Sequence, residues 1–509
     1  MRIVLDRNKP VPLARQIQAH LERLMRDGLL PAGAKLPATR ELADELGVNR
    51  ATVVLAYEEL VAAGLARARV GQGTFVAERV AERAPVEGTV ARGTAPIEWS
   101  EIFSRSAQII AEDERRRAVG GPGALADGVI SFAGGMPDSA LFPTDAFRRA
   151  LNEVIRREGE ALLQYYPVAG YPPLRRYLST YLLRFGLEAT PDEILIVNGS
   201  QQGFDLIART LVDPSDVVAI EQPTYPRAMQ VFRSFGAQLV AVPWDEAGPR
   251  AEVFERVLER HGPKLFYCQP TCHNPTGLGM STETRRRLLA AAAHHQVPIV
   301  EDGFDGSLYY GARPPGPLKA HDADGVVIYI GTFSKILFPG LRLGWLVAPS
   351  PVIERLQAAK QLADLHTSAL IQAAVHRFCE RRLLDRHAAR VVREYRRRRE
   401  LLLGALARRM PAGTTWTEPA GGFSLFVTLP EGMTAMRLLP LALGRGVAFT
   451  PGDAFFLNGS GTRALRLSFS SVPTDQIDRG VQRLADAVRE AQRRPPRGPA
   501  LERVAVPLV

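Results

Sequence analysis

Cysteine is scarce in this chain, whose 509 residues contain only Cys268, Cys272 and Cys379. Three thiols cannot form the disulfide framework of a secreted scaffold, and they favour a reducing compartment. Cys268, Cys272 and His273 are followed by no second ligand pair at zinc-like spacing, so the sequence predicts no metal site. No apolar run reaches the roughly 18 residues that cross a bilayer, and the first residues lack the apolar core of a signal peptide. These absences predict a cytoplasmic protein that does not span a membrane.

An excess of negative charge is also missing. Lys and Arg number 64 against 54 Asp and Glu, and the formal net charge of +10 favours polyanionic partners without establishing DNA binding. The length exceeds what one hydrophobic core normally supports, so two or more domains are expected. We divide the chain into a small domain at 1–78, a Gly- and Pro-rich linker at 79–125, a large body at 126–490 and a flexible tail at 491–509. Within the linker, one short helix is expected around Ile102–Arg117.

The first domain has the pattern of short helices followed by a hairpin. After a first amphipathic helix, a second is expected over Arg40–Leu46 with Thr39 as its N-cap. Asn49 can cap a third helix over Arg50–Ala63, and Leu65–Val76 has the pattern of a β-hairpin. The inward-facing residues of the third helix are expected to be Val53, Tyr57, Leu60 and Val61. Two helices joined by a short turn and followed by a hairpin predict a winged helix-turn-helix.

Polar residues gather where the second and third of these helices meet, which is where such motifs contact bases. The candidate base-contacting residues are Arg40, Asn49, Arg50 and Thr52. Arginine can contact guanine through two hydrogen bonds, whereas Asn49 could contact adenine or only cap its helix. Gly71 and Gly73 near the hairpin tip would let the wing approach the backbone of the nucleic acid. We therefore predict a double-stranded DNA operator as a partner; a helix-turn-helix that binds no DNA is the alternative.

From about residue 129, short apolar segments alternate with amphipathic helical stretches. This alternation predicts an α/β fold with a mainly parallel sheet. The expected strands are Ile194–Asn198, Val217–Glu221, Gln238–Val242, Lys264–Gln269, Pro298–Asp302, Val326–Gly331 and Gly344–Ala348. From about residue 375, one long charged helix to about Arg409 and strands near Gly422–Thr428 and Ala464–Phe469 predict a smaller α+β lobe.

The run GTFSKILFPGLRLGW at residues 331–345 has the pattern of a pyridoxal phosphate (PLP) site. Lys335 would form a Schiff base with the cofactor aldehyde. The phosphate would be held by Thr332, Ser334 and Arg342. Asp302 ends a strand of buried type, where α/β proteins place their ligands, and its carboxylate would pair with the protonated pyridine nitrogen.

Other segments supply the remaining parts of such a site. The segment 198–203 follows a strand and opens a helix, so its amides and Ser200 suit a phosphate. Asn274 can donate to the ring oxygen, Tyr225 can stack on the ring, and Arg466 can pair with a carboxylate. Each motif alone has an ordinary interpretation, such as a turn, a cap or a surface ion pair. Their order and spacing together favour cofactor binding.

On these motifs, residues from about 129 to 490 resemble a fold-type I aminotransferase of the kynurenine and α-aminoadipate branch. Residues 10–78 resemble the winged helix of GntR-type repressors, and the two joined resemble the MocR/GabR family of PLP-dependent transcription regulators. The resemblance implies cofactor or ligand roles for Ser200, Gln201, Tyr225, Asn274, Asp302, Thr332, Ser334, Lys335, Arg342 and Arg466. Tyr165 matches a tyrosine that reaches the partner subunit's phosphate, which implies a homodimer.

One position departs from the family pattern. Phe304 occupies a position where these proteins usually carry a tyrosine that donates to the ring oxygen. Without that donor, the pKa of the Schiff base is expected to be higher than in a relative with tyrosine. The departure also weakens the case for efficient amino-group transfer.

The resemblance implies a regulator that senses a small amine or amino acid, or PLP itself, at Lys335. Arg466 suggests an acidic group on the effector, and Arg227 is a second candidate anchor. A true aminotransferase with an accessory DNA-binding domain is the alternative, and a sensor of PLP supply alone is a third interpretation. The linker length leaves open whether each head belongs with its own body or, domain-swapped, with that of the partner.

Overall fold

The computed structural model describes residues 5, 12–26, 29–69, 73–77, 99–117, 128–303, 306–311 and 316–493. The chain divides into two compact units, Met1–Glu98 and Trp99–Val509. Phe304, Gly71 and the tail from residue 494 lie outside the described residues. Among the helices of the described part, none is long and apolar enough to cross a membrane.

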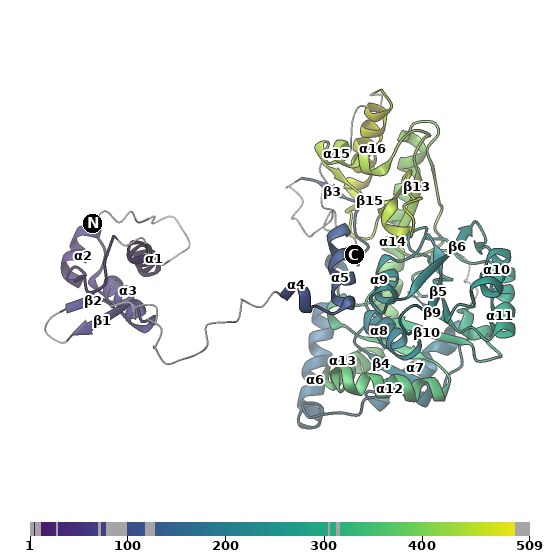
Figure 1. The fold of residues 1–509 in the computed structure, drawn as a ribbon, viewed down its shortest axis with the longest axis horizontal. Helices are drawn as coiled ribbons and strands as arrows, with labels where there is room; N and C mark the ends of the chain where they lie inside the picture. The colour runs from purple at the N-terminus through teal and green to yellow at the C-terminus, as the bar shows by residue number, and fades with distance from the viewer. Residues whose placement is uncertain are drawn as a thin grey trace. The chain divides into compact units, whose positions relative to one another are not determined.

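The first unit has the predicted winged helix-turn-helix fold. Its helices are α1 (Leu13–Arg26), α2 (Thr39–Leu46) and α3 (Arg50–Ala62), and its strands β1 (Ala66–Arg69) and β2 (Gly73–Val76) pair antiparallel. Figure 1 shows the two strands beside the helices within this unit. The hydrophobic core joins all three helices to the hairpin, because Ile17, Leu42, Leu60 and Val76 are buried together.

Two details of this unit differ from the prediction. Thr39 is the first residue of α2 rather than its cap, because the cap is Ala38, whose amide faces the Glu41 carboxylate. Val61 is 38% exposed although Val53, Tyr57 and Leu60 are buried as expected. Each helical residue turns the side chain by about 100°, so Val61 points away from the side that Leu60 buries.

The second unit contains an eight-stranded sheet with the order β4-β11-β10-β9-β8-β5-β6-β7. Its strands are β4 (Ile194–Val197), β5 (Val217–Gln222), β6 (Gln238–Asp245), β7 (Gly248–Pro249), β8 (Leu265–Cys268), β9 (Ile299–Asp302), β10 (Val327–Thr332) and β11 (Gly344–Val347). The central strands β10, β9, β8, β5 and β6 are parallel, whereas β11 is antiparallel to both of its neighbours. The seven predicted strands are therefore confirmed; the two-residue β7 had no counterpart in the prediction.

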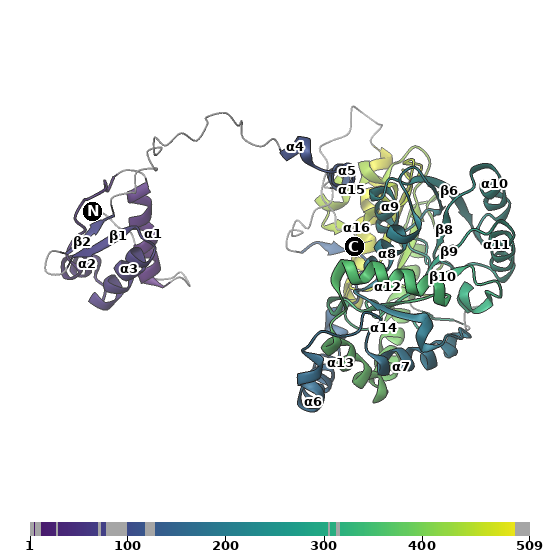
Figure 2. The same cartoon turned by 60° about the horizontal axis from the view of Figure 1, so that its bottom comes forward.

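Helices cover both faces of this sheet. On one face the core includes α8 (Ser200–Leu211), α9 (Pro226–Ser234) and α12 (Ser350–Asp364). On the other face it includes α10 (Ala251–His261) and α11 (Thr282–His295), which lie together at one side of the unit in Figures 1 and 2. Successive residues of β5 serve opposite faces: Val218 and Ile220 pack with α8 and α9, and Ala219 packs with α10. The strands are buried on both sides, as expected for a parallel sheet.

The C-terminal part forms the predicted smaller lobe, at the top of Figure 1. Its antiparallel sheet has the order β12-β13-β16-β15. The elements are β12 (Thr415–Trp416), β13 (Ser424–Thr428), β15 (Thr450–Pro451), β16 (Ala464–Ser468), α15 (Ala435–Gly444) and α16 (Thr474–Arg493). The predicted long charged helix to about Arg409 is confirmed as α14 (Leu383–Arg409), but it begins later than residue 375, because α13 (Ala369–Glu380) is a separate helix before it. Arg382 between them has φ of 57°, a left-handed conformation that a right-handed helix cannot contain.

Two helices precede the sheet within the second unit. They are α4 (Trp99–Ile102) and α5 (Arg105–Arg117), and α5 confirms the short helix expected within the linker stretch. Asp113 of α5 lies 3.7 Å from the Arg233 guanidinium of α9, and Glu114 lies 3.0 Å from that of Arg227. The helix α5 is thus attached to α9.

Candidate functional site: a lysine cavity

Lys335, just after β10, lies at the centre of the candidate site. Its Nζ donates to the Gly135 carbonyl at 3.2 Å. Desolvation of the amine, reinforced by the positive charge of Arg466, lowers the pKa of Lys335 to about 8. A substantial fraction of this amine is therefore neutral near physiological pH, and the neutral amine is the nucleophilic form.

Asp302, the last residue of β9, brings a buried carboxylate to the same cavity. Its Oδ2 accepts from Tyr267 at 3.0 Å and from Gln269 Nε2 at 2.6 Å. Burial raises the pKa of Asp302 to about 6, although these two hydrogen bonds oppose the shift. A cationic ligand group beside it would favour the ionised carboxylate.

Gln269 and Tyr267, which the prediction did not assign to the site, hold this carboxylate. The Gln269 side-chain oxygen accepts from the backbone amide of Asn274 at 3.1 Å. The backbone amide of Gln269 donates to buried Glu221 at 2.8 Å. These residues belong to the carboxyl end of β8, which lies beside β9 in parallel register. Two polar residues at the end of a strand next to that of Asp302 were the signal that could have found them.

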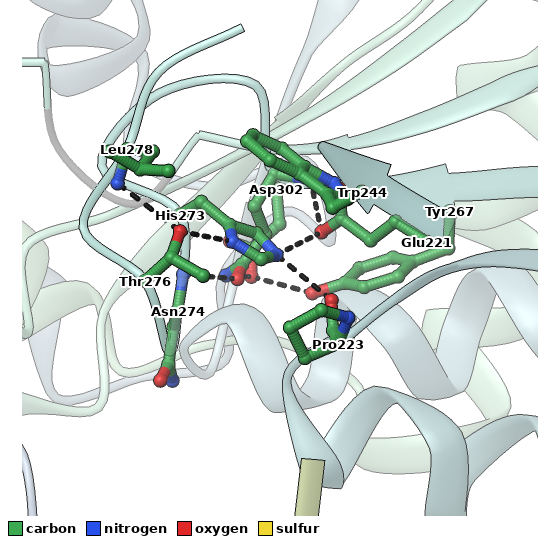
Figure 3. Close-up of polar contacts among 10 residues, drawn as sticks. Glu221, Pro223, Trp244, Tyr267, His273, Asn274, Thr276, Leu278 and Asp302 are labelled. Carbon is green, nitrogen blue, oxygen red and sulfur yellow. Dashed lines mark hydrogen bonds and ion pairs between the residues drawn. The ribbon is translucent and has the colours of Figure 1, made fainter. Parts of the chain in front are cut away.

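His273 is a fully buried part of the support for this loop. Its Nδ1 lies 2.7 Å from Thr276 Oγ1, and its Nε2 lies 3.0 Å from the Pro223 carbonyl and 3.4 Å from Glu221 Oε1 (Figure 3). The Trp244 ring stacks on the imidazole with centroids 4.0 Å apart, and its Nε1 donates to Glu221 at 2.7 Å. Within the described residues, no group of three His, Cys, Asp or Glu could hold a metal ion.

The turn that carries Asn274 is attached to the small lobe. Thr417 Oγ1 donates to the Thr276 carbonyl at 2.6 Å. Gly277 has φ of 71°, and a Cβ there would lie 2.3 Å from Pro419 Cβ and 2.5 Å from the Ser424 carbonyl oxygen. This close approach requires glycine, because any side chain would collide with the small lobe.

The start of α8 forms the other end of the cavity. Ser200 is the first residue of α8, and Gly199 before it has φ of 77°. A Cβ on Gly199 would lie 2.8 Å from Nη2 of Arg342, so the guanidinium lies over this turn. At the end of β10, Thr332 Oγ1 accepts from the Ser334 backbone amide at 3.1 Å. Hydroxyls, an arginine and a helix N-terminus gathered in this way favour an anion.

Arg466 of β16 reaches the cavity from the small lobe. Its Nη1 donates to Asn274 Oδ1 at 3.0 Å, and Nη2 donates to the Gly134 carbonyl. The guanidinium carbon lies 5.0 Å from the centre of the Phe455 ring, and burial lowers the pKa of Arg466 to about 10. Among the described residues, its buried Nε has no hydrogen-bond partner.

One cavity brings most of the predicted residues together. It is lined by Gly135, Ser200, Tyr225, Gln269, Cys272, Asn274, Gly277, Asp302, Thr332, Lys335, Phe423, Ser424 and Arg466. Ser334 is buried beside this cavity, whereas Gln201 is exposed and does not line it. Tyr165 is 80% exposed and also lies outside the lining.

Arg227 is placed differently from its predicted role. It does not line the cavity; its Nη1 pairs with Glu114 of α5 at 3.0 Å and donates to Gln230 at 3.1 Å. Arg227 lies only two residues after Tyr225, so its position in sequence is close to the cavity although its guanidinium engages α5. The geometry therefore lends no support to Arg227 as an effector anchor.

In the first unit, the predicted DNA-contacting residues lie at the junction of α2 and α3. Arg40, Asn49 and Arg50 are exposed, and Thr52 is half-buried. Asn49 caps α3 by accepting from the Ala51 amide at 2.9 Å, so its capping role is confirmed. Exposed Lys35 lies close to the hairpin, because a Cβ on Gly73 would lie 3.0 Å from its Cε.

Comparison with known proteins follows the same division. Residues 128–484 match the family described as aminotransferase class I and II, and residues 13–76 match that of bacterial regulatory proteins, gntR family. LysN, an α-aminoadipate aminotransferase from Thermus thermophilus solved with N-(5'-phosphopyridoxyl)-L-leucine, is 38% identical and superimposes with a TM-score of 0.71, covering 78% of this chain and 100% of its own.

Two relatives match across both units. The HTH-type transcriptional regulator YisV of Bacillus subtilis is 33% identical over 95% of this chain and 97% of its own length. The probable rhizopine catabolism regulatory protein MocR of Rhizobium meliloti is 31% identical over 95% of each chain. The chain therefore belongs to the family of MocR-type helix-turn-helix transcriptional regulators, in which a GntR domain is fused to a class I and II aminotransferase domain.

Proposed function

We propose that this protein is a PLP-dependent DNA-binding regulator that senses a small amine or amino acid, or PLP itself, through Lys335. The observation that carries the proposal is the single cavity that joins Lys335, Asp302 and the start of α8, in a chain that also has a winged helix-turn-helix. A GntR domain implies DNA binding, and a class I and II aminotransferase domain typically binds PLP.

The residues of the cavity fit the cofactor. Ser200, Thr332, Ser334 and Arg342 would hold the phosphate at the start of α8, and Tyr225 would face the ring. Asp302 would hold the proton on the pyridine nitrogen, and Asn274 would donate to the ring oxygen. The LysN structure contains a phosphopyridoxyl compound, which supports the same chemistry here. Arg466 Nε, buried without a partner among the described residues, is a donor available to a ligand in the same cavity.

When bound, PLP supplies an aldehyde that captures amines and a protonated ring that withdraws electrons. The chain's own residues set the conditions for this chemistry. Lys335, with its lowered pKa, offers a larger fraction of neutral amine than an ordinary lysine, and buried Asp302 offers a negative charge to the ring. Arg466 offers its guanidinium to an anion, and its burial makes such a pair stronger than it would be in water.

The effector is proposed to be an amine that also carries a carboxylate. Arg466 is 2% exposed, and its pKa is depressed because its charge is desolvated. A ligand carboxylate would offset that cost through charge-assisted hydrogen bonds. A simple alkylamine has no carboxylate to pair with the buried Arg466 guanidinium, so we expect it to bind more weakly.

Homodimer formation is part of the proposal. An aminotransferase fold is typically dimeric, and Tyr165 is 80% exposed, outside the cavity of its own chain. Leu163 and Leu362 are large apolar residues that are 73% and 91% exposed. A second copy would cover such surfaces and bring its own Tyr165 to the phosphate end of the cavity.

Communication with the DNA-binding unit is proposed to pass through α5. This helix pairs with α9, whose N-cap is the cavity residue Tyr225. An effector that favours one position of α9 would therefore shift α5 as well. Such a ligand changes the equilibrium only by the difference in its affinity for the two positions.

The test is binding of the full-length protein to DNA from directly upstream of its own gene, with and without PLP and candidate amino acids. We expect saturable, sequence-preferring binding with a steep salt dependence, altered by PLP or by an amine that carries a carboxylate. Weak binding that ignores sequence and both ligands would refute the regulator.

Amino-group transfer is the second candidate function. It is favoured by the cavity pair of Lys335 and Asp302 and by 38% identity to an α-aminoadipate aminotransferase. Steady-state transfer from amino acids to 2-oxo acids, compared between the native protein and Lys335→Ala, would decide it. Turnover that disappears in the variant would establish an enzyme.

A further inference from the structure

A second lysine, Lys360, is fully buried on α12 outside the cavity lining. Its Nζ donates to both carboxylate oxygens of Asp364 at 2.8 Å and to Gln202 Oε1 at 3.1 Å. Burial lowers the pKa of Lys360, and its hydrogen bond to Asp364 opposes that shift. Buried ion pairs often stabilise a fold no better than apolar residues do, so this one calls for another role.

The Lys360–Asp364 pair holds the turn between β4 and α8. Asp364 Oδ2 accepts from the Asn198 side chain and from Gln202 Nε2, the latter at 2.7 Å. Gln202 Oε1 in turn accepts from the backbone amide of Asn198 at 2.7 Å. The backbone and side-chain groups of the turn therefore converge on one buried ion pair of another helix.

The same turn forms the phosphate end of the cavity. Gly199 lies under the Arg342 guanidinium, and Ser200 lines the cavity. Gln202 lies two residues after Ser200, which is about 200° around a helix. The ion pair therefore holds the first turn of α8 from the side opposite to the cavity, and so fixes the rotation of that turn about the helix axis.

We propose that Lys360, Asp364 and Gln202 are positioning residues that orient the first turn of α8 toward the phosphate of a phosphorylated pyridoxal. The inference rests on the proposed binding of PLP and adds residues that make the site select the phosphorylated form. None of the three touches the ligand. They act through Ser200 and the amides of the first turn, whose hydrogen bonds to a phosphate depend on direction.

The test compares two ligands that differ only in the phosphate, PLP and pyridoxal, on full-length Gln202→Met. This variant removes the Gln202 links to the turn and leaves the hydrogen bond from the Asn198 side chain to Asp364. Lys360 stays paired with Asp364, so no buried charge loses its partner. We expect the dissociation constant for PLP, followed by absorbance, to rise about tenfold, equivalent to about one well-placed hydrogen bond. The dissociation constant for pyridoxal should change less than about twofold. The ³¹P resonance of bound PLP should also shift.

Lys319→Met is the control for the loss of a Lys–Asp pair. It removes Lys319 from Asp322 at 2.8 Å, in the same unit but outside the cavity, and Asp322 keeps its hydrogen bonds from the Val326 and Val327 backbone amides. It should leave both dissociation constants unchanged. The double variant Lys360→Met with Asp364→Leu removes the pair without leaving a single buried charge, and should repeat the selective loss for PLP.

Equal weakening of PLP and pyridoxal in Gln202→Met, or no weakening of either, would overturn the positioning role while PLP binding by the native protein stands. Absence of PLP binding by the native protein would overturn the proposed function and this inference together. If the control variant also loses affinity for PLP but not for pyridoxal, the effect is a general one of charge, and the positioning role is overturned.

Discussion

The winged-helix unit and the lysine cavity place their functional residues in opposite ways. Arg40, Asn49 and Arg50 come from a stretch of a few residues, and all are exposed. The residues that line the cavity extend from Gly135 to Arg466, and Asp302 and Arg466 among them are buried. The first surface is built by neighbours in sequence, whereas the cavity exists only after the sheet and the small lobe have come together.

This difference separates the physical variables that control each site. Exposed cations interact with a polyanion mainly through counterion release, so salt should govern the DNA-binding unit. Desolvated groups such as Lys335 and Asp302 have pKa values moved to about 8 and about 6, so pH should govern the cavity. Operator binding should therefore follow ionic strength, and cofactor binding should follow pH.

Lys335→Ala should have the largest effect. We expect complete loss of the absorbance band of bound cofactor and of any response to amines, because no other residue of the cavity lining is an amine. Operator affinity at fixed salt should stay within about twofold of native, since the exposed residues of the first unit are unchanged. Loss of operator binding in this variant would mean that the two sites are not independent.

Asp302→Asn should change the pH dependence of stability in the cofactor-free protein. Burial raises the pKa of Asp302 from 3.8 to about 6, so the folded protein holds a proton there that the unfolded chain has lost. The bound proton on Asp302 therefore stabilises the fold fully below pH 3.8, and this stabilisation is lost as the pH rises through about 6. The asparagine variant should lack this fall, which amounts to about 3 kcal/mol.

Urea unfolding at several pH values, followed by tryptophan fluorescence, measures this effect. Trp99, Trp244, Trp345 and Trp416 all lie in the second unit, so the signal reports that unit alone. Glu301, whose pKa burial raises to about 7, is present in both proteins and contributes equally to each curve. Parallel curves for the two proteins would contradict the raised pKa of Asp302.

Arg50→Ala should weaken operator binding by about 1–3 kcal/mol, or roughly 5- to 150-fold, if Arg50 contacts a base. The PLP dissociation constant should not change. Fluorescence anisotropy with a labelled operator measures the first quantity, over a range of salt. Arg397→Ala removes the same charge from an exposed position on α14 and serves as the control. An equal loss in both variants would reassign the effect to overall charge.

Glu114→Gln should have the smallest effect on stability and bears directly on the independence of the two sites. The Glu114–Arg227 pair is largely exposed, so its removal should cost less than about 1 kcal/mol. If α5 transmits the signal, the change in operator affinity caused by PLP or an amine should shrink by about twofold or more. Glu283→Gln, which breaks the exposed Glu283–Arg286 pair, should leave that change intact.

Local patterns in the sequence predicted most of the elements, and partners distant in sequence accounted for most of the differences. Asn49 was identified as a cap from its neighbours, and Asp302 from its place at the end of a strand. Gln269 was missed because its role depends on β8 lying next to β9, which periodicity does not reveal. Arg227 was assigned to the effector because nothing in the sequence placed Glu114 beside it.

The contact of Gly277 with Pro419 and Ser424 has a mechanical consequence. With no space for a side chain and with Thr417 hydrogen-bonded to Thr276, this turn is coupled to the small lobe. A rotation of that lobe would carry Arg466 and would pull on Asn274, to which Arg466 is hydrogen-bonded. The backbone amide of Asn274 is also held by Gln269 at the end of β8. Lys335 and Asp302 would stay with the large sheet. The cavity thus lies between the large sheet and the small lobe. A ligand that contacts both parts can change the distance between them.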